Sequence, residues 1–296
     1  MELRDVEIFL TLAEELHFGR TAGRLHVSAA RISQSVKKTE RRIGAPLFER
    51  TSRVVRLTPI GEQLRSDLRS GYRQIMRGID AASAAALGAS GALTLGTMGP
   101  LSITISDMLD LFRARHPGAE VRHREIQPPA PLDLLRSGEV DVAMLWRPVR
   151  EPDLSVGPVV HTSGVLLMVS AEHPYAGMDS ICLEDLGDHC AQVAPTSIPS
   201  YMEAGLAPHH TPSGRPIPRG PRVATWQEAL STVSSGQAVA VVMADIPPYY
   251  AWPSLAFVPI RDAPPCEWVL VWRTTDETPM IRALAQAARD IAIRNG

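Results

Sequence analysis

Hydrophobic positions at the start of the chain recur at helical spacing. From Val6 to Leu16 an apolar side chain returns every three or four residues, which predicts an amphipathic helix over residues 3–16. Two shorter helices are predicted before and after a turn at His26-Val27, with Ser28 as the N-cap of the second. The apolar residues expected to hold these two helices together are Ala22, Leu25, Ile32 and Val36. This pattern is typical of a helix-turn-helix packed on a scaffold helix.

A short hairpin and a long helix are predicted next. Gly44 suits the left-handed position that ends a helix, and extended segments on both sides of Ser52-Arg53 predict a β-hairpin with a basic tip. Thr58-Pro59 then places an N-cap before a proline in the first helical position. The apolar stripe that marks this helix consists of Leu64, Leu68, Tyr72, Ile75 and Ile79. We expect no cover for the stripe inside the small N-terminal domain, so either a second copy or the C-terminal domain covers it.

From residue 92 the pattern changes to alternating strands and helices. The first unit is predicted as strand, helix, strand, helix and strand at 93–97, 101–116, 120–126, 131–137 and 140–146. The second unit and the return to the first are predicted as strands at 165–170, 190–194, 239–243 and 268–273, with helices at 226–235 and 279–295. This order implies two α/β lobes built on parallel sheets with helices on both faces. Residues 195–221 contain seven prolines and predict a long irregular surface segment.

Charge separates the N-terminal part of the chain from the rest. Residues 20–56 hold ten Lys and Arg against two acids, a net charge of +8. Residues 1–90 carry +5 and residues 91–296 carry −7, so the overall −2 conceals a basic head on an acidic body. A DNA duplex is a dense line of negative charge, and a basic helix-turn-helix fits its major groove. Nucleic-acid binding is therefore predicted for the N-terminal part alone.

Side-chain chemistry suggests a role for each polar residue of this head. Arg31 and Gln34 are the candidates for reading base edges, because Arg pairs with guanine and Gln with adenine, while a phosphate contact is the alternative for Arg31. Ala29 and Ala30 begin the same helix and belong to the predicted DNA-binding face. Arg53 at the hairpin tip suits a narrow minor groove. Phosphate contacts are predicted for Ser28, Ser33, Lys37 and Lys38.

Residues 1–65 resemble the winged helix-turn-helix of LysR-type transcriptional regulators. The matching positions are Ala22, Leu25, Val27-Ser28, Ile32-Ser33, Val36, Glu40, Gly44, Pro46-Leu47-Phe48, Arg50, Leu57-Thr58-Pro59 and Gly61. The chain departs from the family inside the recognition helix, where Ala29-Ala30 replace the usual Gln-Pro. Arg31, Gln34 and Thr39 also stand where a small residue, Arg and Leu are usual. The resemblance therefore implies the fold and leaves the DNA sequence open.

Several expectations follow from the resemblance alone. It implies that Arg50 is the wing arginine that binds DNA, with a salt bridge to Glu40 or Glu49 as the alternative. It also implies that the long helix pairs antiparallel with a second copy, giving a homodimer or homotetramer with two reading heads. Double-stranded DNA, a small-molecule effector and RNA polymerase are the implied partners. The two lobes are similar to the periplasmic-binding-protein fold of LysR effector domains, with crossovers near 161–164 and 264–267.

The resemblance and the element pattern together predict three parts of the chain. Residues 1–58 are predicted as the DNA-binding domain, and 59–90 as the linker or dimerisation helix with its hinge. Residues 91–296 are predicted as the effector-binding domain. Its first lobe is expected at about 91–162 and 267–296, and its second at about 163–266.

A ligand site is predicted between the lobes, outside the carboxyl ends of the strands. The predicted effector-binding residues are Thr97, Met98, Gly99, Pro100, Leu101, Ser102, Trp146, Arg147, Pro195, Thr196, Ser197, Thr225 and Trp226. Free N–H groups where the helix starts at Leu101 suit an anion, and the two tryptophans with Met98 favour a partly apolar effector with an acidic group. Ordinary core packing is the alternative for both tryptophans.

Other functions receive little support from the sequence. The chain has no G-x-S-x-G, H-E-x-x-H, Walker or G-x-G-x-x-G motif, so neither an enzyme nor a cofactor is predicted. His209-His210 lack metal-ligand spacing, and no metal site is predicted. Cys182, Cys190 and Cys266 are expected to be free thiols of a cytoplasmic protein, with a Cys182–Cys190 redox pair as the alternative. The two rival functions are a ligand-binding protein or enzyme with a vestigial head, and a ligand-independent architectural DNA binder.

Overall fold

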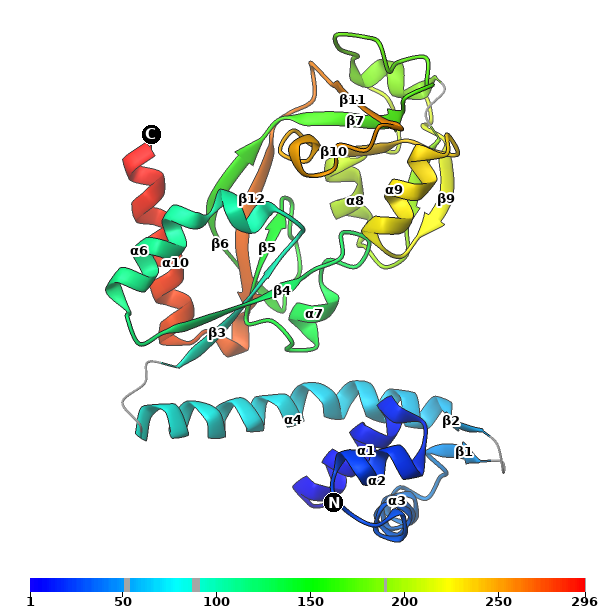
Figure 1. Cartoon of the computed structure of the whole chain (residues 1–296), viewed down its shortest axis with the longest axis vertical. Helices are drawn as coiled ribbons and strands as arrows, with labels where there is room; N and C mark the ends of the chain where they lie inside the picture. Colours follow the sequence, from blue (N-terminus) through cyan, green and yellow to red (C-terminus); the bar gives the residue numbers. More distant parts are fainter. Residues whose placement is uncertain (51–53, 87–90, 189–190, 296) are drawn as a thin grey trace. The chain divides into compact units, whose positions relative to one another are not determined.

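The computed structural model describes residues 1–50, 54–86, 91–188 and 191–295. The chain divides into two compact units, Met1–Gly88 and Ala89–Gly296, and each is described separately below. Figure 1 shows the first unit as a cluster of short helices on a long one, and the second as a two-lobed α/β unit.

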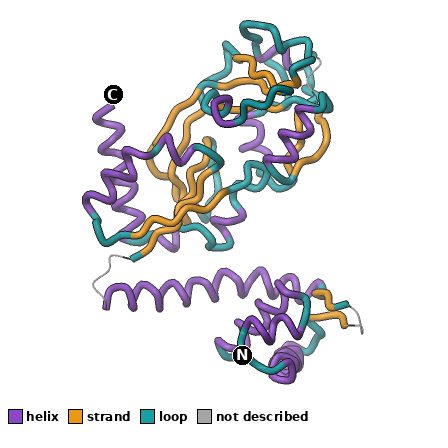
Figure 2. Tube along the Cα trace, in the orientation of Figure 1, coloured by secondary structure: helices purple, strands orange, loops and turns teal. Residues whose placement is uncertain are grey.

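The first unit is helical apart from one short hairpin (Figure 2). Its elements are α1 (Leu3–Glu15), α2 (Phe18–Arg24), α3 (Ala29–Ile43), β1 (Phe48–Arg50), β2 (Val55–Leu57) and α4 (Pro59–Ala86). Strands β1 and β2 pair antiparallel, which confirms the predicted hairpin, although its tip at 51–53 lies outside the described residues. Its core is made by Ile8, Phe9, Leu12, Ile32, Val36, Leu47 and Phe48, all at most 3% exposed. The rings of Phe9 and Phe48 meet edge to face at 5.6 Å.

The predicted helix ends are confirmed at three positions. The Ser28 hydroxyl accepts the N–H of Arg31 at 3.2 Å, and Gly44 ends α3 with a φ of 82°. The Thr58 hydroxyl accepts the N–H of Gly61 at 3.0 Å at the start of α4. Leu16, which was predicted on the apolar stripe of α1, is instead its left-handed C-cap and 41% exposed. Local sequence therefore sets where these helices begin and end.

The prediction that the stripe on α4 is uncovered within its own unit is wrong for its first half. Leu64, Leu68 and Tyr72 pack against the core of the first unit, because α4 lies against α1. Ile75 and Ile79 lie beyond that contact and are 50% and 49% exposed. Only this second half of the stripe is available for another partner.

The second unit contains two lobes joined by two crossovers. The first lobe consists of β3 (Ala92–Thr97), α5 (Leu101–Thr104), α6 (Ser106–Arg115), β4 (Glu120–Glu125), α7 (Asp133–Arg136), β5 (Val142–Trp146), β6 (Leu154–Ser163), β12 (Cys266–Arg273), a 3-10 turn (Thr274–Asp276) and α10 (Pro279–Asn295). The second lobe consists of β7 (Val165–Ser170), a 3-10 turn (Leu183–Gly187), β8 (Gln192–Pro195), α8 (Ser200–Leu206), β9 (Arg219–Val223), α9 (Trp226–Ser234), β10 (Ala240–Met243), a 3-10 turn (Pro247–Tyr249) and β11 (Leu255–Pro259). The crossovers lie between β6 and β7 and between β11 and β12, as predicted.

The main sheet of the first lobe is mixed rather than wholly parallel. Its order is β4-β3-β5-β12-β6, in which β3 runs parallel to β4 and β5. Strand β12 runs antiparallel to β5 and β6, because the chain returns from the second lobe in the opposite direction. Helices α6 and α10 pack together beside this sheet (Figure 2). The central strand β5 is buried along its whole length, as expected for a strand covered on both faces.

Two other predictions about the second unit are wrong. The helix expected at 101–116 breaks at Ile105, where the Thr104 hydroxyl bonds the Leu101 carbonyl at 2.8 Å and Ile105 turns into the core. The segment 195–221, expected to be irregular, contains α8 and the start of β9. Met202 is fully buried and Ile217 is 4% exposed, so apolar burial folds this proline-rich segment.

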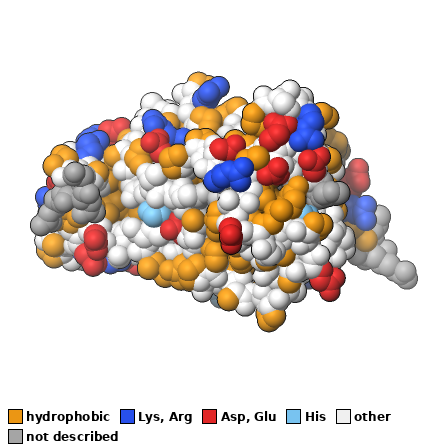
Figure 3. All heavy atoms as spheres, turned by 90° about the horizontal axis from the view of Figure 1, so that it is seen from above, with side chains coloured by type: hydrophobic (Ala, Val, Ile, Leu, Met, Phe, Trp, Pro, Cys, Tyr) orange, Lys and Arg blue, Asp and Glu red, His pale blue; other side chains and the backbone are white. Residues whose placement is uncertain are grey.

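Charged side chains of both signs lie close together on the face drawn in Figure 3. In the second lobe, a charged cluster ties the 211–215 turn to Glu184. The Glu184 carboxylate accepts the Ser213 N–H at 3.0 Å and the Arg215 Nε–H at 2.9 Å. Hydrogen bonds from the Ser213 hydroxyl and then from Arg215 lower the pKa of Glu184 from 4.5 to about 2.

This lowered pKa predicts an acid-dependent loss of stability. A group whose pKa falls on folding stabilises the fold above its unfolded pKa, and the effect is lost as pH falls through the folded pKa. At neutral pH Glu184→Gln is expected to unfold at a lower temperature than the natural chain, and the difference should shrink between pH 4.5 and about 2. Thermal unfolding followed by circular dichroism checks this, with the exposed Glu172→Gln as control. If the difference in unfolding temperature does not change with pH, the lost stability comes from packing and not from the charge of Glu184.

Candidate functional sites

Helix α3 presents one exposed polar face. Its buried side consists of Ile32, Ser35, Val36 and Thr39, and its exposed side includes Ala30, Arg31, Gln34, Lys37 and Arg41. Within the described residues, the side-chain polar groups of Arg31, Gln34 and Lys37 have no partner, although their backbone groups do. Side chains of this kind can donate to phosphates and base edges without first breaking an internal bond.

The arginines of α2 are used differently. Arg20 forms an ion pair with Glu15 at 3.1 Å, and Arg24 reaches both Glu14 and Glu15 at 3.1 Å. These contacts tie α2 to the end of α1 and neutralise two charges of the basic stretch. The remaining positive charge of the helix pair is therefore concentrated on α3.

Lys38 is also occupied within the first unit. Its ammonium group lies 3.0 Å from the Glu2 carboxylate and 3.1 Å from that of Asp5. Asp5 is 4% exposed and also accepts the Ser35 hydroxyl at 2.7 Å. Burial opposes ionisation of Asp5, but hydrogen bonds from Ser35, the Glu2 N–H and Lys38 together hold its pKa below the usual value. The geometry places Lys38 in the α1–α3 contact, and its role as a phosphate ligand stays a prediction.

The other predicted DNA-binding residues have varied positions. Ser28 and Ala29 are exposed at the start of α3, and Ser33 is half-buried. Arg50 ends β1, but its side chain is outside the described part of the chain, as is the whole of Arg53. Glu40, the suggested salt-bridge partner of Arg50, accepts the N–H of Leu47 at 3.0 Å. This bond braces the turn that leads into the hairpin.

A pocket of about 70 Å³ lies between the lobes of the second unit, and we name it the Trp268 pocket. The first lobe contributes the loop after β3 with Trp146 and Trp268, and the second contributes Trp226, Tyr250 and β10. The indoles of Trp146 and Trp268 meet at 5.9 Å and 71°, and Trp226 meets Tyr250 at 5.5 Å and 70°. These edge-to-face pairs are the geometry that aromatic rings prefer. The pocket is therefore mainly aromatic and apolar.

Gly99 allows this pocket to close on one side. It has a φ of 49°, and a Cβ at this position would lie 3.0 Å from the Tyr250 hydroxyl. A larger residue would therefore push Tyr250 away from the loop after β3. Burial raises the pKa of Tyr250, so its phenol stays protonated at neutral pH.

A second pocket of about 90 Å³ adjoins the first, and we name it the Gln192 pocket. The residues that line both pockets are Pro128, Trp146, Leu206, Trp226 and Val241. Two of its lining residues are held by Arg219, which donates to the Gln192 side-chain oxygen at 2.7 Å and pairs with Glu203 at 3.1 Å. Trp146, a third lining residue, donates from Nε1 to the Met202 carbonyl at 3.0 Å. The two pockets are therefore neighbours that share mostly apolar walls.

The structure brings some of the predicted effector residues together. Those lining the Trp268 or Gln192 pocket are Met98, Gly99, Pro100, Leu101, Trp146, Pro195 and Trp226. Those that line neither pocket are Thr97, Ser102, Thr196, Ser197 and Thr225. Thr225 instead caps α9 by accepting the Glu228 N–H at 3.2 Å. The expected anion site at the start of α5 is also absent in the predicted form, because this helix has four residues and the Leu101 N–H bonds the Met98 carbonyl at 3.2 Å.

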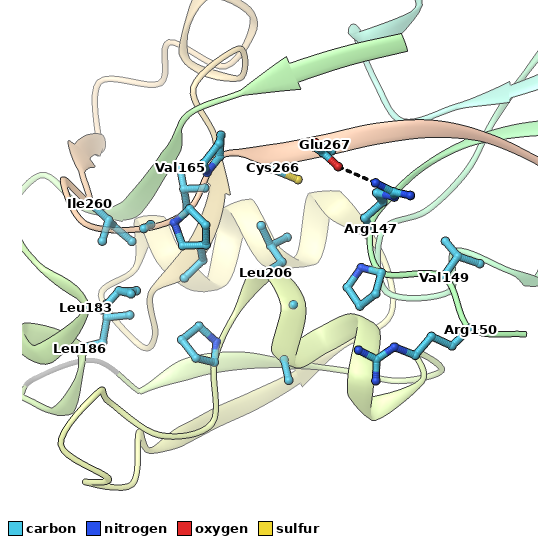
Figure 4. Close-up of a pocket in the computed structure, with 18 of the residues that line it drawn as sticks. Arg147, Val149, Arg150, Val165, Leu183, Leu186, Leu206, Ile260, Cys266 and Glu267 are labelled. Carbon is cyan, nitrogen blue, oxygen red and sulfur yellow. Dashed lines mark hydrogen bonds and ion pairs between the residues drawn. The ribbon is translucent and has the colours of Figure 1, made fainter. Parts of the chain in front are cut away.

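Arg147 lies in a different and larger pocket of about 900 Å³. It forms an ion pair with Glu267 at 2.8 Å (Figure 4), and Arg150 and Cys266 line the same pocket. Arg147 therefore lines this pocket and not the two pockets that contain the tryptophans, and its predicted role in effector binding stays a prediction. Gln192, Trp268 and Tyr250 were missed, since their types and local spacing carry no ligand-binding signal.

Other expectations can be checked only on part of the chain. Cys182 and Cys266 have free thiols, and burial raises the pKa of Cys266 to about 12. Cys190 lies outside the described residues, so its suggested pairing with Cys182 stays a hypothesis. Across the described ranges, no group of three His, Cys, Asp or Glu is placed to hold a metal ion. The same ranges include no helix long and apolar enough to cross a membrane.

Protein-family models match both the N-terminal unit and the two-lobed unit of this chain. Residues 3–62 match the bacterial regulatory helix-turn-helix of the lysR family, and residues 86–292 match the LysR substrate binding domain. The chain belongs to the LysR family of transcriptional regulators. This LysR-type regulator thus combines a DNA-binding head with an effector-binding domain, as the sequence resemblance implied.

Individual relatives extend along most of the chain. The regulator XapR of Escherichia coli (strain K12) is 30% identical over 303 residues, covering 96% of each protein. AlsR of Bacillus subtilis (strain 168) is 28% identical over 296 residues, covering 95% of this chain and 93% of AlsR. The crystal structure of CbnR, a LysR family regulator, has a TM-score of 0.72 at 22% identity and covers 98% of this chain and 99% of CbnR. CbnR complexed with its target DNA has a TM-score of 0.69 at 23% identity. These structures show the shared fold.

Proposed function

We propose that this LysR-type regulator reads DNA through α3 and responds to a small molecule in the Trp268 and Gln192 pockets. In this proposal residues 1–58 bind DNA, 59–90 form the dimerisation helix and hinge, and 91–296 bind the effector. The observation that carries it is the exposed face of α3, where the side-chain polar groups of Arg31, Gln34 and Lys37 have no internal partner within the described residues. Such a protein would act in the cytoplasm, where chromosomal DNA lies.

Each exposed residue of α3 has a role in the proposal. Arg31 and Gln34 contact base edges. Arg31 can bond guanine through two donors, and Gln34 can bond adenine through one donor and one acceptor. Lys37 holds a phosphate, as a flexible point charge does. The start of the helix at Ser28, Ala29 and Ala30, together with Ser33, lies against the DNA backbone. The wing residues Arg50 and Arg53 complete the interface.

A homodimer is part of the same proposal. Ile75 and Ile79 are half exposed on a helix of 28 residues, whose first half is already packed on its own unit. Pairing this second half with another copy would bury both isoleucines and present two heads to two half-sites. Further pairing of dimers into a tetramer and contact with RNA polymerase are consistent with this arrangement.

Effector binding would act through the two crossovers. A molecule between the lobes contacts both of them, so it favours the lobe arrangement to which it binds more tightly. That population shift would alter how a dimer presents its two heads. An enzyme with a vestigial head gains no support from a site lined mainly by apolar side chains, and a purely architectural DNA binder leaves the two inter-lobe pockets without a role.

Two measurements test the proposal. A gel shift with genomic fragments should reveal specific DNA binding that weakens as salt concentration rises, because binding releases counterions. A thermal-shift screen of metabolites should find a ligand that raises the unfolding temperature by mass action. The absence of specific, salt-dependent binding at every fragment tested would exclude the regulator function.

Replacing Arg31 or Lys37 by alanine should separate base reading from phosphate binding. Arg31→Ala is expected to cost about 1–3 kcal/mol on the specific site and to flatten the preference at one base pair per half-site. Lys37→Ala, its matched control, should weaken binding on all sequences and lower the salt slope by about one. Binding titrations on operator and random duplexes at several salt concentrations measure both effects. Equal losses on the two duplexes for Arg31→Ala would assign Arg31 to phosphate.

A further inference from the structure

Three buried side-chain N–H groups of residues that line the inter-lobe site, those of Trp268, Gln192 and Trp226, have no hydrogen-bond acceptor within the described part of the chain. Trp268 is 0% exposed and lines the Trp268 pocket, and its Nε1 has no acceptor among the described residues. Gln192 is 1% exposed and lines the Gln192 pocket, and its Nε2 is likewise unpaired within the described part of the chain. Leaving a buried donor unpaired is unfavourable, and a ligand acceptor would remove that cost.

Arg219 determines which end of the Gln192 amide is free. A guanidinium can only donate, so the atom it contacts at 2.7 Å is the amide oxygen. Arg219 is itself held by the Glu203 carboxylate at 3.1 Å and the Ala207 carbonyl at 3.3 Å. The unpaired end of the amide is therefore its NH₂ group, which only an acceptor can satisfy.

The charge around the site indicates what kind of acceptor fits. The described residues that line the two pockets include no Lys, Arg or His, and their charged members are Glu125 and Glu203. Glu203 is neutralised by Arg219, whereas Glu125 is exposed at the end of β4. A carboxylate ligand would lose its hydration here without meeting a cation, which is strongly unfavourable. The acidic group predicted from sequence therefore has no support in this lining.

We propose that the effector is an uncharged, largely apolar molecule whose hydrogen-bond acceptors, such as carbonyl or ether oxygens, bind Gln192 and Trp268. This inference rests on the proposed function, because it names the ligand class of the same inter-lobe site. Gln192 and Trp268 are then its specificity-determining residues. The aromatic walls made by Trp146, Trp226 and Tyr250 supply the apolar contacts.

Three small probes of similar ring size test the ligand class on the full-length protein. Acetophenone is uncharged with an acceptor, ethylbenzene is uncharged without one, and benzoate is anionic. In NMR titrations we expect acetophenone to bind about fivefold more tightly than ethylbenzene, because one hydrogen bond contributes about that much affinity. We expect it to bind at least about tenfold more tightly than benzoate. Benzoate binding as tightly as acetophenone, or ethylbenzene binding equally well, overturns the proposal.

Gln192→Glu tests the residue assignment. It keeps an oxygen acceptor for Arg219 and removes the unpaired NH₂ group, so the preference for acetophenone over ethylbenzene should shrink. Gln237→Glu makes the same chemical change at an exposed site outside both pockets and should leave the preference unchanged. Trp268→Phe removes the indole N–H donor and should also reduce the preference for acetophenone over ethylbenzene. Equal losses for both probes would indicate a structural role and would count against the assignment.

A gel shift on the same protein preparation separates this inference from the proposed function. Specific DNA binding together with tight benzoate binding would overturn the ligand class and leave the regulator function standing. Selective acetophenone binding without specific DNA binding would support the ligand class and overturn the regulator function.

Discussion

The double substitution Ile75→Glu with Ile79→Glu is expected to convert a dimer into monomers and to weaken binding to a two-half-site operator by about a hundredfold or more. The two isoleucines are 50% and 49% exposed in the single chain. Burying an isoleucine fully against a second helix contributes about 1.5–3 kcal/mol, and a carboxylate in its place would lose hydration without a counter-charge. A monomer also loses the gain in affinity that comes from joining two heads.

Sedimentation equilibrium and gel shifts measure these two effects. Met178→Glu is the control, because Met178 is 51% exposed and belongs to the second unit, not to α4. The control should leave assembly and DNA affinity unchanged. A double variant that remains a dimer with full affinity would place the dimer interface outside the second half of α4.

Asp5→Ala is expected to loosen the recognition helix from its scaffold. Asp5 joins α1 to α3 through Ser35 at 2.7 Å and Lys38 at 3.1 Å, and both Asp5 and Ser35 are 4% exposed. Removing the carboxylate leaves the buried Ser35 hydroxyl without this acceptor, so the free energy of opening α3 should fall by about 2 kcal/mol. DNA affinity should fall as well, since α3 would no longer be held in one orientation.

Hydrogen–deuterium exchange of the peptide 29–43 measures this opening directly. Asp67→Ala removes an exposed carboxylate on α4 and should leave the exchange of α3 unchanged. The pKa of Asp5 is lowered in the fold, so its contribution is present above the unfolded pKa of about 3.8 and is lost as pH falls below it. Unchanged exchange in Asp5→Ala would show that apolar packing alone holds α3.

Most features set by neighbouring residues could be predicted from the sequence. Ser28, Gly44 and Thr58 act at helix ends, where a side chain or a glycine satisfies backbone groups a few residues away. The two crossovers could also be placed, because buried strands such as 165–170 read as short apolar runs.

Elements that depend on distant contacts were missed. Strand β6 contains Gly157 and Pro158, which are poor strand formers, yet its pairing with β12 makes it a ten-residue strand. Helix α8 lies in a proline-rich segment, and the burial of Met202 and the hydrogen bond from Trp146 to its carbonyl hold it. Tertiary burial outweighs local propensity at both places.

Helix α3 and its exposed residues were determined by the sequence itself. Caps, spacing and charge all act within α2 and α3, so they can be read from consecutive residues. Only the tertiary structure decided the character of the proposed effector site. Gln192 and Trp268 come from separate lobes and line neighbouring pockets because the chain crosses between the lobes twice, and Arg147 is paired with Glu267. Which donors are left unpaired depends on these long-range contacts, and no local pattern encodes them.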